Sequence, residues 1–312
     1  MGAAPGRPGE QGEKPTGPAG ARAIGSRRRP TITPTIDRLL ADTRRRLAAA
    51  PFRPSTREAA LLLGRVLGLS EAQVLARSRD RVPATEARRF RELLERRLAG
   101  EPVAYLLGEK EFFGRPFAVD RRVLIPRPES EHLVESALAQ RLPEEPRILD
   151  VGTGSGCLAV TLALELPGAR VTAVDVSPAA LVVASANARR HGVAGRVVCA
   201  AADLVRGLEL SRFDLVVSNP PYIDPATAQE LSPEIREHEP PAALFAEGRG
   251  RAILDRLLRE LAALRSGAPL ILEIGFEQAD WLRQRADASV FELHEVRSDY
   301  SGLPRVVVLR RR

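Results

Sequence analysis

The sequence predicts an α/β protein in which a doubly wound, mainly parallel sheet follows a small helical domain. Two patterns support this fold class. From Arg147 onward, short apolar runs that suit buried strands alternate with helical segments. Residues 34–108 show helical periodicity alone. The chain has 312 residues and 44% hydrophobic content, which is enough to fill the cores of one large domain or two modest ones.

The positive charge of the sequence is concentrated at its two ends. Residues 1–30 hold six basic and two acidic side chains (6 − 2 = +4) and the last three residues are arginines (+3), which together account for the formal net charge of +7. Residues 31–309 are therefore neutral, and net charge gives no support for a nucleic-acid groove. Residues 1–33 lack the apolar core of a secretory signal, and we expect them to form a disordered head.

The cysteine and histidine content suits a cytoplasmic protein without a metal centre. Two cysteines, Cys157 and Cys199, exclude a disulfide framework and fit a reducing compartment. The four histidines form no ligand-spaced cluster with cysteine, so we expect no metal ion. No apolar run approaches ~18 residues, so we expect no membrane span. Nothing in the sequence demands an oligomer, and we expect a monomer.

Residues 34–108 are predicted to form a helical bundle. Ser55 and Glu58 fit a capping box, in which the Ser55 hydroxyl accepts from the N3 backbone and Glu58 reaches back. Residues 109–126 contain short apolar pieces around turn residues, which predicts a β-hairpin linker. Residues 127–312 then form the main domain. Within the bundle, helices are expected at Thr35–Ala50, Ala59–Leu67, Glu71–Arg77 and Ala84–Leu98.

Seven strands and the helices between them complete the chain. Strands alternating with helices in this order give the doubly wound topology. The strands are expected at Arg147–Val151, Val171–Asp175, Arg196–Ala200, Phe213–Ser218, Pro269–Ile274, Val290–Val296 and Arg305–Leu309. The helices are expected from Pro126 to about Arg141, at Leu158–Leu166, from Pro178 (with Ser177 as cap) to near Gly192, and at Ala252–Leu264.

A glycine-rich loop joins the first strand of the sheet to the next helix. In Asp150-x-Gly152-x-Gly154-x-Gly156 the glycines let the backbone approach a ligand closely, with helix N–H groups facing it. Asp175 ends the second strand, 175 − 154 = 21 residues after Gly154. A carboxylate at that position can accept both hydroxyls of an adenosine ribose. A loop whose glycines merely make a tight turn is the alternative.

Two details of this loop favour S-adenosylmethionine over a dinucleotide. The spacing is G-x-G-x-G rather than G-x-G-x-x-G, and Asp150 stands directly before it. A carboxylate there would disfavour an anionic pyrophosphate, whereas it can order water or the cationic end of a methionine-like group. Asp203, at the end of the third strand, is a candidate for the adenine side of the site, with a loop-capping aspartate as the alternative.

Asn219-Pro220-Pro221-Tyr222 forms a rigid corner directly after the fourth strand. The two prolines lack N–H groups and fix the backbone, and open α/β sheets place their ligands at this end of a strand. The Asn219 side-chain oxygen and the Pro220 carbonyl are placed to accept both hydrogens of a planar –NH₂ group, and Tyr222 to pack against it. Because a sulfonium methyl is already activated, this chemistry needs no metal and no strong base.

These residues resemble the peptide-chain release factor glutamine N5-methyltransferase family. The resemblance covers roughly residues 34–309 and implies a Rossmann-like, seven-stranded methyltransferase sheet. It also implies that S-adenosylmethionine methylates the glutamine of the Gly-Gly-Gln loop in class 1 peptide-chain release factors, giving N5-methylglutamine. The matching segments are Pro102–Gly108, Leu124–Glu129, Leu149–Cys157, Val217–Ile223 and Leu272–Gly275.

The resemblance also assigns residues to the two parts of the site. The helical domain would help to dock the release factor. Two positions depart from the family pattern: Leu204 stands where an aromatic residue can occur, and Ala246–Gly250 replaces a Gly-Gly-x-Asp-Gly turn. The donor site would comprise Gly152, Thr153, Gly154, Ser155, Gly156, Asp175, Leu204 and Asn219, and the glutamine site Asn219, Pro220, Pro221 and Tyr222.

Two other functions share parts of this pattern. A nucleic-acid adenine N6-methyltransferase has the same Asn-Pro-Pro-Tyr corner, but it needs a target-recognition region, a basic groove and stacking aromatics. Aromatic residues make up 4% of this chain, so we expect no direct nucleic-acid partner. A non-catalytic binding module of the translation machinery is the third possibility, and the intact donor loop together with Asn219 argues against it.

Overall fold

A computed structural model describes residues 33–50, 52 and 54–312 of the protein. The predicted disorder of residues 1–33 lies outside the described residues except at Thr33. Five helices come first, and their apolar faces share a core of their own around Leu62, Leu63 and Phe90. The predicted N-terminal helical domain is therefore present. Its helices are α1 (Ile36–Ala48), α2 (Glu58–Leu67), α3 (Glu71–Ala76), α4 (Ala84–Leu98) and α5 (Val103–Leu107).

The capping box predicted at Ser55 forms only in part. The Glu58 carboxylate accepts from the Ser55 backbone N–H at 2.8 Å, as expected, but the Ser55 hydroxyl accepts from the Arg57 N–H at 3.3 Å. The helix begins at Glu58 itself, with Arg57 as N-cap, so Ser55 lies too far ahead of the first turn to cap it. A complete capping box forms instead at Ser70 and Gln73, ahead of α3.

A β-hairpin links the helices to the sheet, as predicted. Its antiparallel strands are β1 (Glu109–Phe112) and β2 (Arg115–Ala118). An extended segment then leads to the 3-10 helix η1 (Pro128–Ser130) and to α6 (Glu131–Leu138). The helix expected between Pro126 and Arg141 is shorter at both ends. Arg127 precedes Pro128 and is held in an extended conformation, with φ −98° and ψ 142°, which delays the helical start.

The main sheet has seven strands in the order β5-β4-β3-β6-β7-β9-β8. The five strands of this sheet that come first in the chain pair in parallel, whereas β9 pairs antiparallel with both β7 and β8. Every strand lies within two residues of its predicted range, so the seven-stranded, mainly parallel sheet is confirmed. The strands are β3 (Arg147–Val151), β4 (Arg170–Asp175), β5 (Val197–Ala201), β6 (Leu215–Ser218), β7 (Pro269–Glu273), β8 (Phe291–Ser298) and β9 (Pro304–Arg311).

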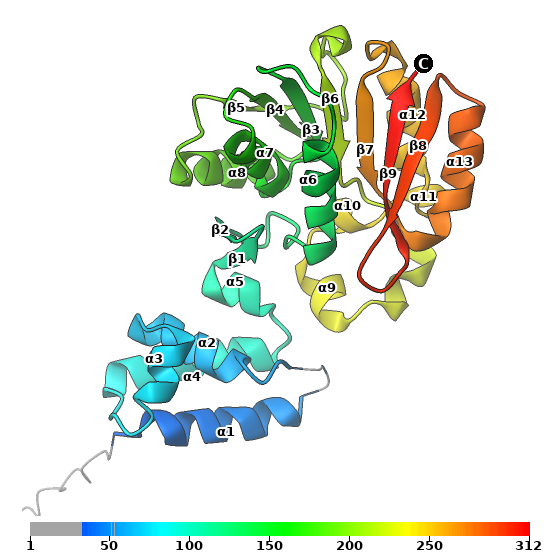
Figure 1. The fold of residues 1–312 in the computed structure, drawn as a ribbon. Coiled ribbons are helices and arrows are strands. Elements are labelled where there is room, and N and C mark those ends of the chain that lie inside the picture. The colour runs from blue at the N-terminus through cyan, green and yellow to red at the C-terminus, as the bar shows by residue number, and fades with distance from the viewer. Residues whose placement is uncertain (1–32, 51, 53) are drawn as a thin grey trace, which may run out of the picture. The chain divides into compact units, whose positions relative to one another are not determined.

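Helices cover both faces of the sheet (Figure 1). One core contains residues of α6, α7 and α8, and the other contains residues of α12 and α13. Each core includes residues of the buried central strands, which are apolar on both sides as parallel strands require. The covering elements are α7 (Cys157–Glu165), α8 (Pro178–Arg190), η2 (Leu210–Arg212), α12 (Ala252–Glu260), η4 (Leu261–Ala263), η5 (Phe276–Gln278) and α13 (Ala279–Asp287).

Four short helices between β6 and α12 were not anticipated from the sequence. They follow the Asn219 corner, and Figure 1 shows α9 and α10 beyond the end of the sheet at which β7 stops. Three of the four begin with a proline in the first turn, a signal that could have revealed them. They are η3 (Pro225–Glu230), α9 (Pro233–His238), α10 (Pro241–Leu244) and α11 (Glu247–Gly250).

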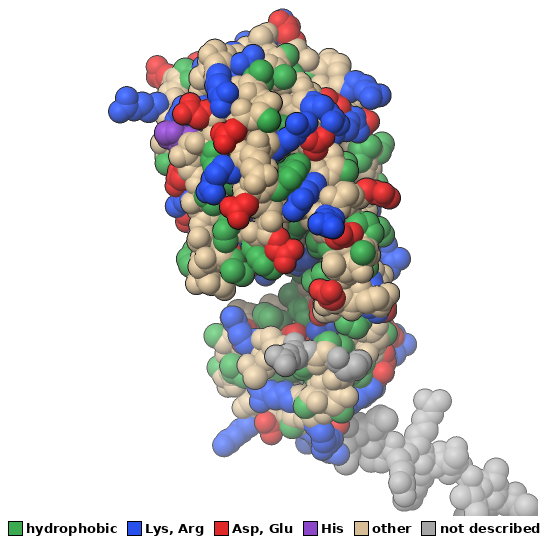
Figure 2. All heavy atoms as spheres, turned by 90° about the vertical axis from the view of Figure 1, so that its right-hand side faces the viewer, with side chains coloured by type: hydrophobic (Ala, Val, Ile, Leu, Met, Phe, Trp, Pro, Cys, Tyr) green, Lys and Arg blue, Asp and Glu red, His purple; other side chains and the backbone are tan. Residues whose placement is uncertain are grey.

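The face of the molecule that carries α13 has a mixed surface. Basic and acidic side chains are interspersed there rather than gathered by sign (Figure 2). Within the described part of the chain, no helix is long and apolar enough to cross a membrane. The same residues contain no group of three or more histidine, cysteine or acidic side chains that could hold a metal ion.

Candidate active site

The glycine loop after β3 has the backbone that only glycine adopts without strain. Gly152, Gly154 and Gly156 have φ angles of +73°, +53° and +79°. A Cβ at Gly156 would lie 3.0 Å from Ala184 of α8, so this glycine also permits close helix packing. The loop is tied to β4, because the Val174 carbonyl accepts from the N–H groups of Gly152 at 2.8 Å and Thr153 at 2.9 Å.

Asp175 lies beside this loop, as predicted from its place at the end of β4. One carboxylate oxygen accepts from the Gly154 N–H and the other from the Ser177 N–H, each at 2.9 Å. Ser177 in turn caps α8 by accepting from the Ala180 N–H at 3.2 Å. The loop, the carboxylate and the helix start are therefore positioned as one unit.

A pocket of about 230 Å³ opens over this unit. The glycine loop and Asp175 form one side of it, and residues Arg122, Val123 and Leu124 of the linker form another. The remaining lining includes Val176, Ser177, Ala180, Asp203, Leu204, Asn219, Pro221, Pro240, Ala242, Ala243 and Ile253. The pocket thus joins most of the donor-site candidates that are far apart in the sequence.

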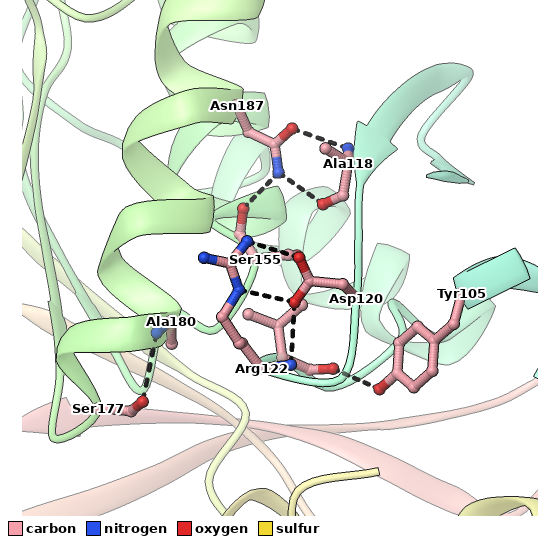
Figure 3. Close-up of polar contacts among 9 residues, drawn as sticks. Tyr105, Ala118, Asp120, Arg122, Ser155, Ser177, Ala180 and Asn187 are labelled. Atoms are coloured by element: carbon pink, nitrogen blue, oxygen red, sulfur yellow. Dashed lines mark hydrogen bonds and ion pairs between the residues drawn. The ribbon is translucent and has the colours of Figure 1, made fainter. Parts of the chain in front are cut away.

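The linker wall of this pocket is held from two directions (Figure 3). Asn187 of α8, which is fully buried, accepts from the Ala118 N–H at 2.8 Å and donates to the carbonyls of Ala118 at 3.0 Å and Ser155 at 2.8 Å. Tyr105 of α5 donates its hydroxyl to the Val123 carbonyl at 2.7 Å. The glycine loop and the linker are therefore locked to each other through one side chain.

Some donor-site candidates are buried and do not form part of the pocket wall. Asp150 is completely buried and accepts from the Thr153 hydroxyl at 2.6 Å. Burial raises the pKa of this carboxyl to about 7. Thr153 and Ser155 are also buried. Asp150 therefore sits under the loop, bonded to Thr153, and does not line the pocket.

Asp203 and Leu204 also line the pocket. Asp203 forms an ion pair with Arg256 at 2.7 Å, and this hydrogen-bonded partner lowers the pKa of the carboxyl. In the described chain no backbone N–H donates to the Asp203 side chain, so its contacts differ from those of a loop cap. Leu204 has a φ of +53°, an unusual conformation for a residue other than glycine.

The Asn219 amide is oriented by a buried hydrogen-bond chain that the sequence did not reveal. Its Nδ2 donates to the Ser130 hydroxyl at 3.0 Å, and that hydroxyl donates to Glu273 at 2.5 Å. Because Ser130 uses its only hydrogen on Glu273, its oxygen accepts from the amide nitrogen, and Oδ1 of Asn219 is left available. Burial raises the pKa of Glu273, which is 1% exposed.

Tyr222 belongs to the same chain of contacts. Its hydroxyl donates to the second Glu273 oxygen at 3.0 Å, and burial raises the pKa of this hydroxyl, so it stays protonated. The Tyr222 carbonyl accepts from Gln278, which also donates to the Gly250 carbonyl at 2.9 Å. Gly250 belongs to the turn that departs from the family pattern, and it is held next to the Asn219 corner by this glutamine.

A second pocket of about 460 Å³ lies on the other side of Asn219. Tyr222 and Glu273 line it, with Arg127 and Glu129 from the segment ahead of α6 and Arg305 from β9. Leu231 and Ile235, from the short helices after the corner, add apolar surface. Leu124, Asn219 and Ala243 line both pockets, so the two pockets adjoin at these residues, and Asn219 is the one among them with a polar side chain.

Sequence reasoning missed several residues of this region. Ser130 and Arg305 had no role assigned, and Glu273 entered only as part of a family motif. The available signals were a buried-strand pattern that ends in a glutamate, and a serine directly after the Pro-Arg-Pro-Glu turn. Pro220 is buried and lines neither pocket, while Pro221 lines the first.

The sheet is seven-stranded and Rossmann-like. A glycine loop and a carboxylate border one pocket, and an asparagine lies between that pocket and a second. This fold and site define an S-adenosylmethionine-dependent methyltransferase. The family model described as PrmC N-terminal domain matches residues 38–108, and the model described as Methyltransferase small domain matches residues 130–260. The hMettl16 catalytic domain, solved with the MAT2A 3'UTR hairpin 6, shares the fold with a TM-score of 0.51 at 18% identity, covering 69% of this chain and 81% of that one.

The similarity to curated relatives extends over nearly the whole length of those relatives. The release factor glutamine methyltransferase of Bordetella pertussis is 44% identical over 80% of this chain and 92% of its own. Those of Koribacter versatilis and Nitratidesulfovibrio vulgaris are 42% and 41% identical, over 83% and 89% of this chain and 92% and 95% of theirs. The chain belongs to the release factor glutamine methyltransferase family.

Proposed function

We propose that the protein transfers a methyl group from S-adenosylmethionine to the side-chain nitrogen of the glutamine in the Gly-Gly-Gln loop of class 1 release factors. The products are N5-methylglutamine, S-adenosylhomocysteine and one proton, which the nitrogen loses when it gains the methyl group. The observation that carries this proposal is the position of Asn219, whose amide lines both the donor pocket and the second pocket. Membership of the family supports a protein glutamine as the group in the second pocket, rather than a nucleic-acid base.

The donor pocket fits the adenosyl and methionine parts of the donor. Gly152 and Gly154 adopt positive φ and line the pocket without side chains, so the backbone itself meets the ligand. We assign Asp175 to the ribose hydroxyls, because its carboxylate lines the pocket at the end of β4. Asp203 and Leu204 belong to the adenine side, and Asp150 stabilises the loop from below.

Asn219 and Pro220 orient the acceptor nitrogen. The bound donor supplies a methyl group that its sulfonium has already activated. An amide nitrogen is a poor nucleophile because its lone pair is delocalised, so its direction must be fixed. We assign the two amide hydrogens to Oδ1 of Asn219 and to the carbonyl of Pro220, a buried residue that lines neither pocket but follows Asn219 directly in the chain. Both contacts would stabilise the positive charge that develops on nitrogen. Ser130 and Glu273 keep the asparagine amide in the required orientation.

The same proposal covers the setting of the protein. The proposed substrate is a protein of the translation machinery, so we propose that the enzyme acts in the cytoplasm. We propose that it acts as a monomer, because nothing in the sequence demands an oligomer. The helical domain of residues 34–108 takes part in docking the release factor.

A transfer assay with labelled donor tests the proposed function. The acceptors are a purified class 1 release factor, the same factor with its loop glutamine changed to alanine, and duplex DNA. We expect label on the unchanged release factor alone. Label on the alanine factor, or on DNA alone, would contradict the proposal.

Asn219→Ala tests the role given to the amide. Removing Oδ1 removes one of the two acceptors for the substrate –NH₂ group, so we expect kcat to fall by at least about 100-fold. Donor binding, measured by calorimetry, should remain measurable because the glycine loop and Asp175 are unchanged. Near-normal turnover by this variant would show that the amide does not orient the nucleophile.

A further inference from the structure

Three large apolar side chains are exposed together at the end of the sheet that carries the second pocket. They are Phe276, Tyr300 and Leu303, with 48%, 82% and 41% of their surface exposed. We call them the aromatic rim. Phe276 and Tyr300 are the only strongly exposed large aromatic residues among the described residues, in a chain with 4% aromatic content.

Phe276 and Leu303 lie at the same end of the β7–β9 ladder. In the β7–β9 ladder Pro269 faces Arg310 and Glu273 faces Val306. The pairing continues past β7, because the Ile274 N–H donates to the Arg305 carbonyl at 2.9 Å. Phe276, at the start of η5, and Leu303, directly ahead of β9, each lie two residues beyond this last paired position, so both are at the same end of the ladder.

The turn between β8 and β9 presents Tyr300 in a defined position. Asp299 closes the turn, because its carboxylate accepts from the N–H groups of Ser301 at 2.9 Å and Leu303 at 3.1 Å. The ring of Tyr300 packs on His132 of α6, with 4.8 Å between ring centroids. A residue with 82% exposure is therefore anchored on one face and open on the other.

The aromatic rim is continuous with the second pocket. Arg305, which lines that pocket, is held by Asp299 at 3.2 Å and donates to the Ile274 carbonyl at 3.2 Å. Gly275, directly before Phe276, lies against the Tyr222 ring, 3.5 Å from where a Cβ would be. Gly275 therefore connects Phe276 to the pocket residue Tyr222, and Arg305 connects the β8–β9 turn to the same pocket.

We propose that the aromatic rim is a docking surface for the protein that carries the acceptor glutamine. This inference rests on the proposed function. A pocket that takes one side chain buries far less than the roughly 800 Å² per partner of a specific protein complex, so the substrate protein needs further contact surface. Exposed aromatic side chains are the residues that most often anchor such contacts. The rim supplies them directly beside the pocket.

Steady-state kinetics on the full-length protein with a purified release factor test this role. We expect Phe276→Ser together with Tyr300→Ser to raise KM for the release factor by about ten-fold or more, because two aromatic anchors are lost. The kcat at saturating release factor and the donor Kd should stay within about two-fold, since neither residue lines a pocket. Tyr300→Phe keeps the ring and should behave like the wild type.

Val182→Ser is the matched control, because Val182 is 56% exposed on α8 and lines neither pocket. It should leave KM unchanged. An unchanged KM in the double variant, or a lower kcat at unchanged KM, would overturn docking at the rim while leaving the methyl-transfer proposal intact. Failure of the wild-type protein to label the release factor would instead overturn both proposals.

Discussion

At the scale of single residues, the orientation of Asn219 depends on side chains far from it in the chain. Ser130, which accepts a hydrogen bond from its amide, lies 89 positions earlier in the chain. Glu273, which accepts from Ser130, lies 143 positions after that serine. The local sequence Asn-Pro-Pro-Tyr fixes the backbone through its prolines. Which end of the amide faces the substrate is decided by residues from η1 and β7.

Gly250 gives a residue-scale prediction. A Cβ there would lie 1.9 Å from the Tyr222 carbonyl oxygen, and the backbone has a φ of +72°. We expect Gly250→Ala to lower the melting temperature and to reduce kcat by about ten-fold or more, because the acceptor corner must move to relieve the clash. Thermal unfolding and the transfer assay measure the two effects.

Gly267→Ala is the control for this prediction. Gly267 has a similar φ of +79°, but nothing lies within 4 Å of its Cβ position. The substitution should therefore cost only the backbone strain of about 1–2 kcal/mol and leave kcat unchanged. Equal effects of the two substitutions on kcat would mean that contact with Tyr222 is not what makes Gly250 necessary.

At the scale of secondary-structure elements, the sheet was predictable and the segment after the acceptor corner was not. Strands such as Leu215–Ser218 are buried on both faces and read as unbroken apolar runs. The short helices at Pro233–His238 and Pro241–Leu244 have too few residues for an apolar periodicity to show. Their contribution to both pockets follows from tertiary packing, which a local pattern does not contain.

The linker between the helices and the sheet yields an element-scale prediction. Tyr105→Phe removes the hydroxyl that donates to the Val123 carbonyl at 2.7 Å. That buried carbonyl then lacks its partner, at a cost of about 1–3 kcal/mol. Because Val123 lines the donor pocket, we expect donor Kd, measured by calorimetry, to rise several-fold. Tyr300→Phe is the matched control, and equal donor affinities in the two variants would contradict a positioning role for Tyr105.

At the scale of the whole molecule, the donor site is built over a buried carboxyl group that also affects stability. Asp150 has no exposed surface, and burial raises the pKa of its carboxyl to about 7. In the unfolded chain the same carboxyl has a pKa of about 3.9. The folded state therefore holds this proton more tightly, and the stability that it contributes is complete below pH ~4 and is lost as pH rises toward ~7.

Asp150→Asn tests this linkage in the donor-free protein. Between pH ~4 and ~7 the free energy of unfolding of the wild type should fall, relative to that of the variant, by about 1.4 kcal/mol per pH unit. The amide keeps the shape of the side chain and carries no charge at any pH, so the difference between the two denaturant-unfolding curves isolates this group. Asp287→Asn, at an exposed aspartate, should follow the wild type throughout. Parallel curves for the wild type and Asp150→Asn would show that the carboxyl titrates alike in the folded and unfolded chains, and would contradict the raised pKa of the buried group.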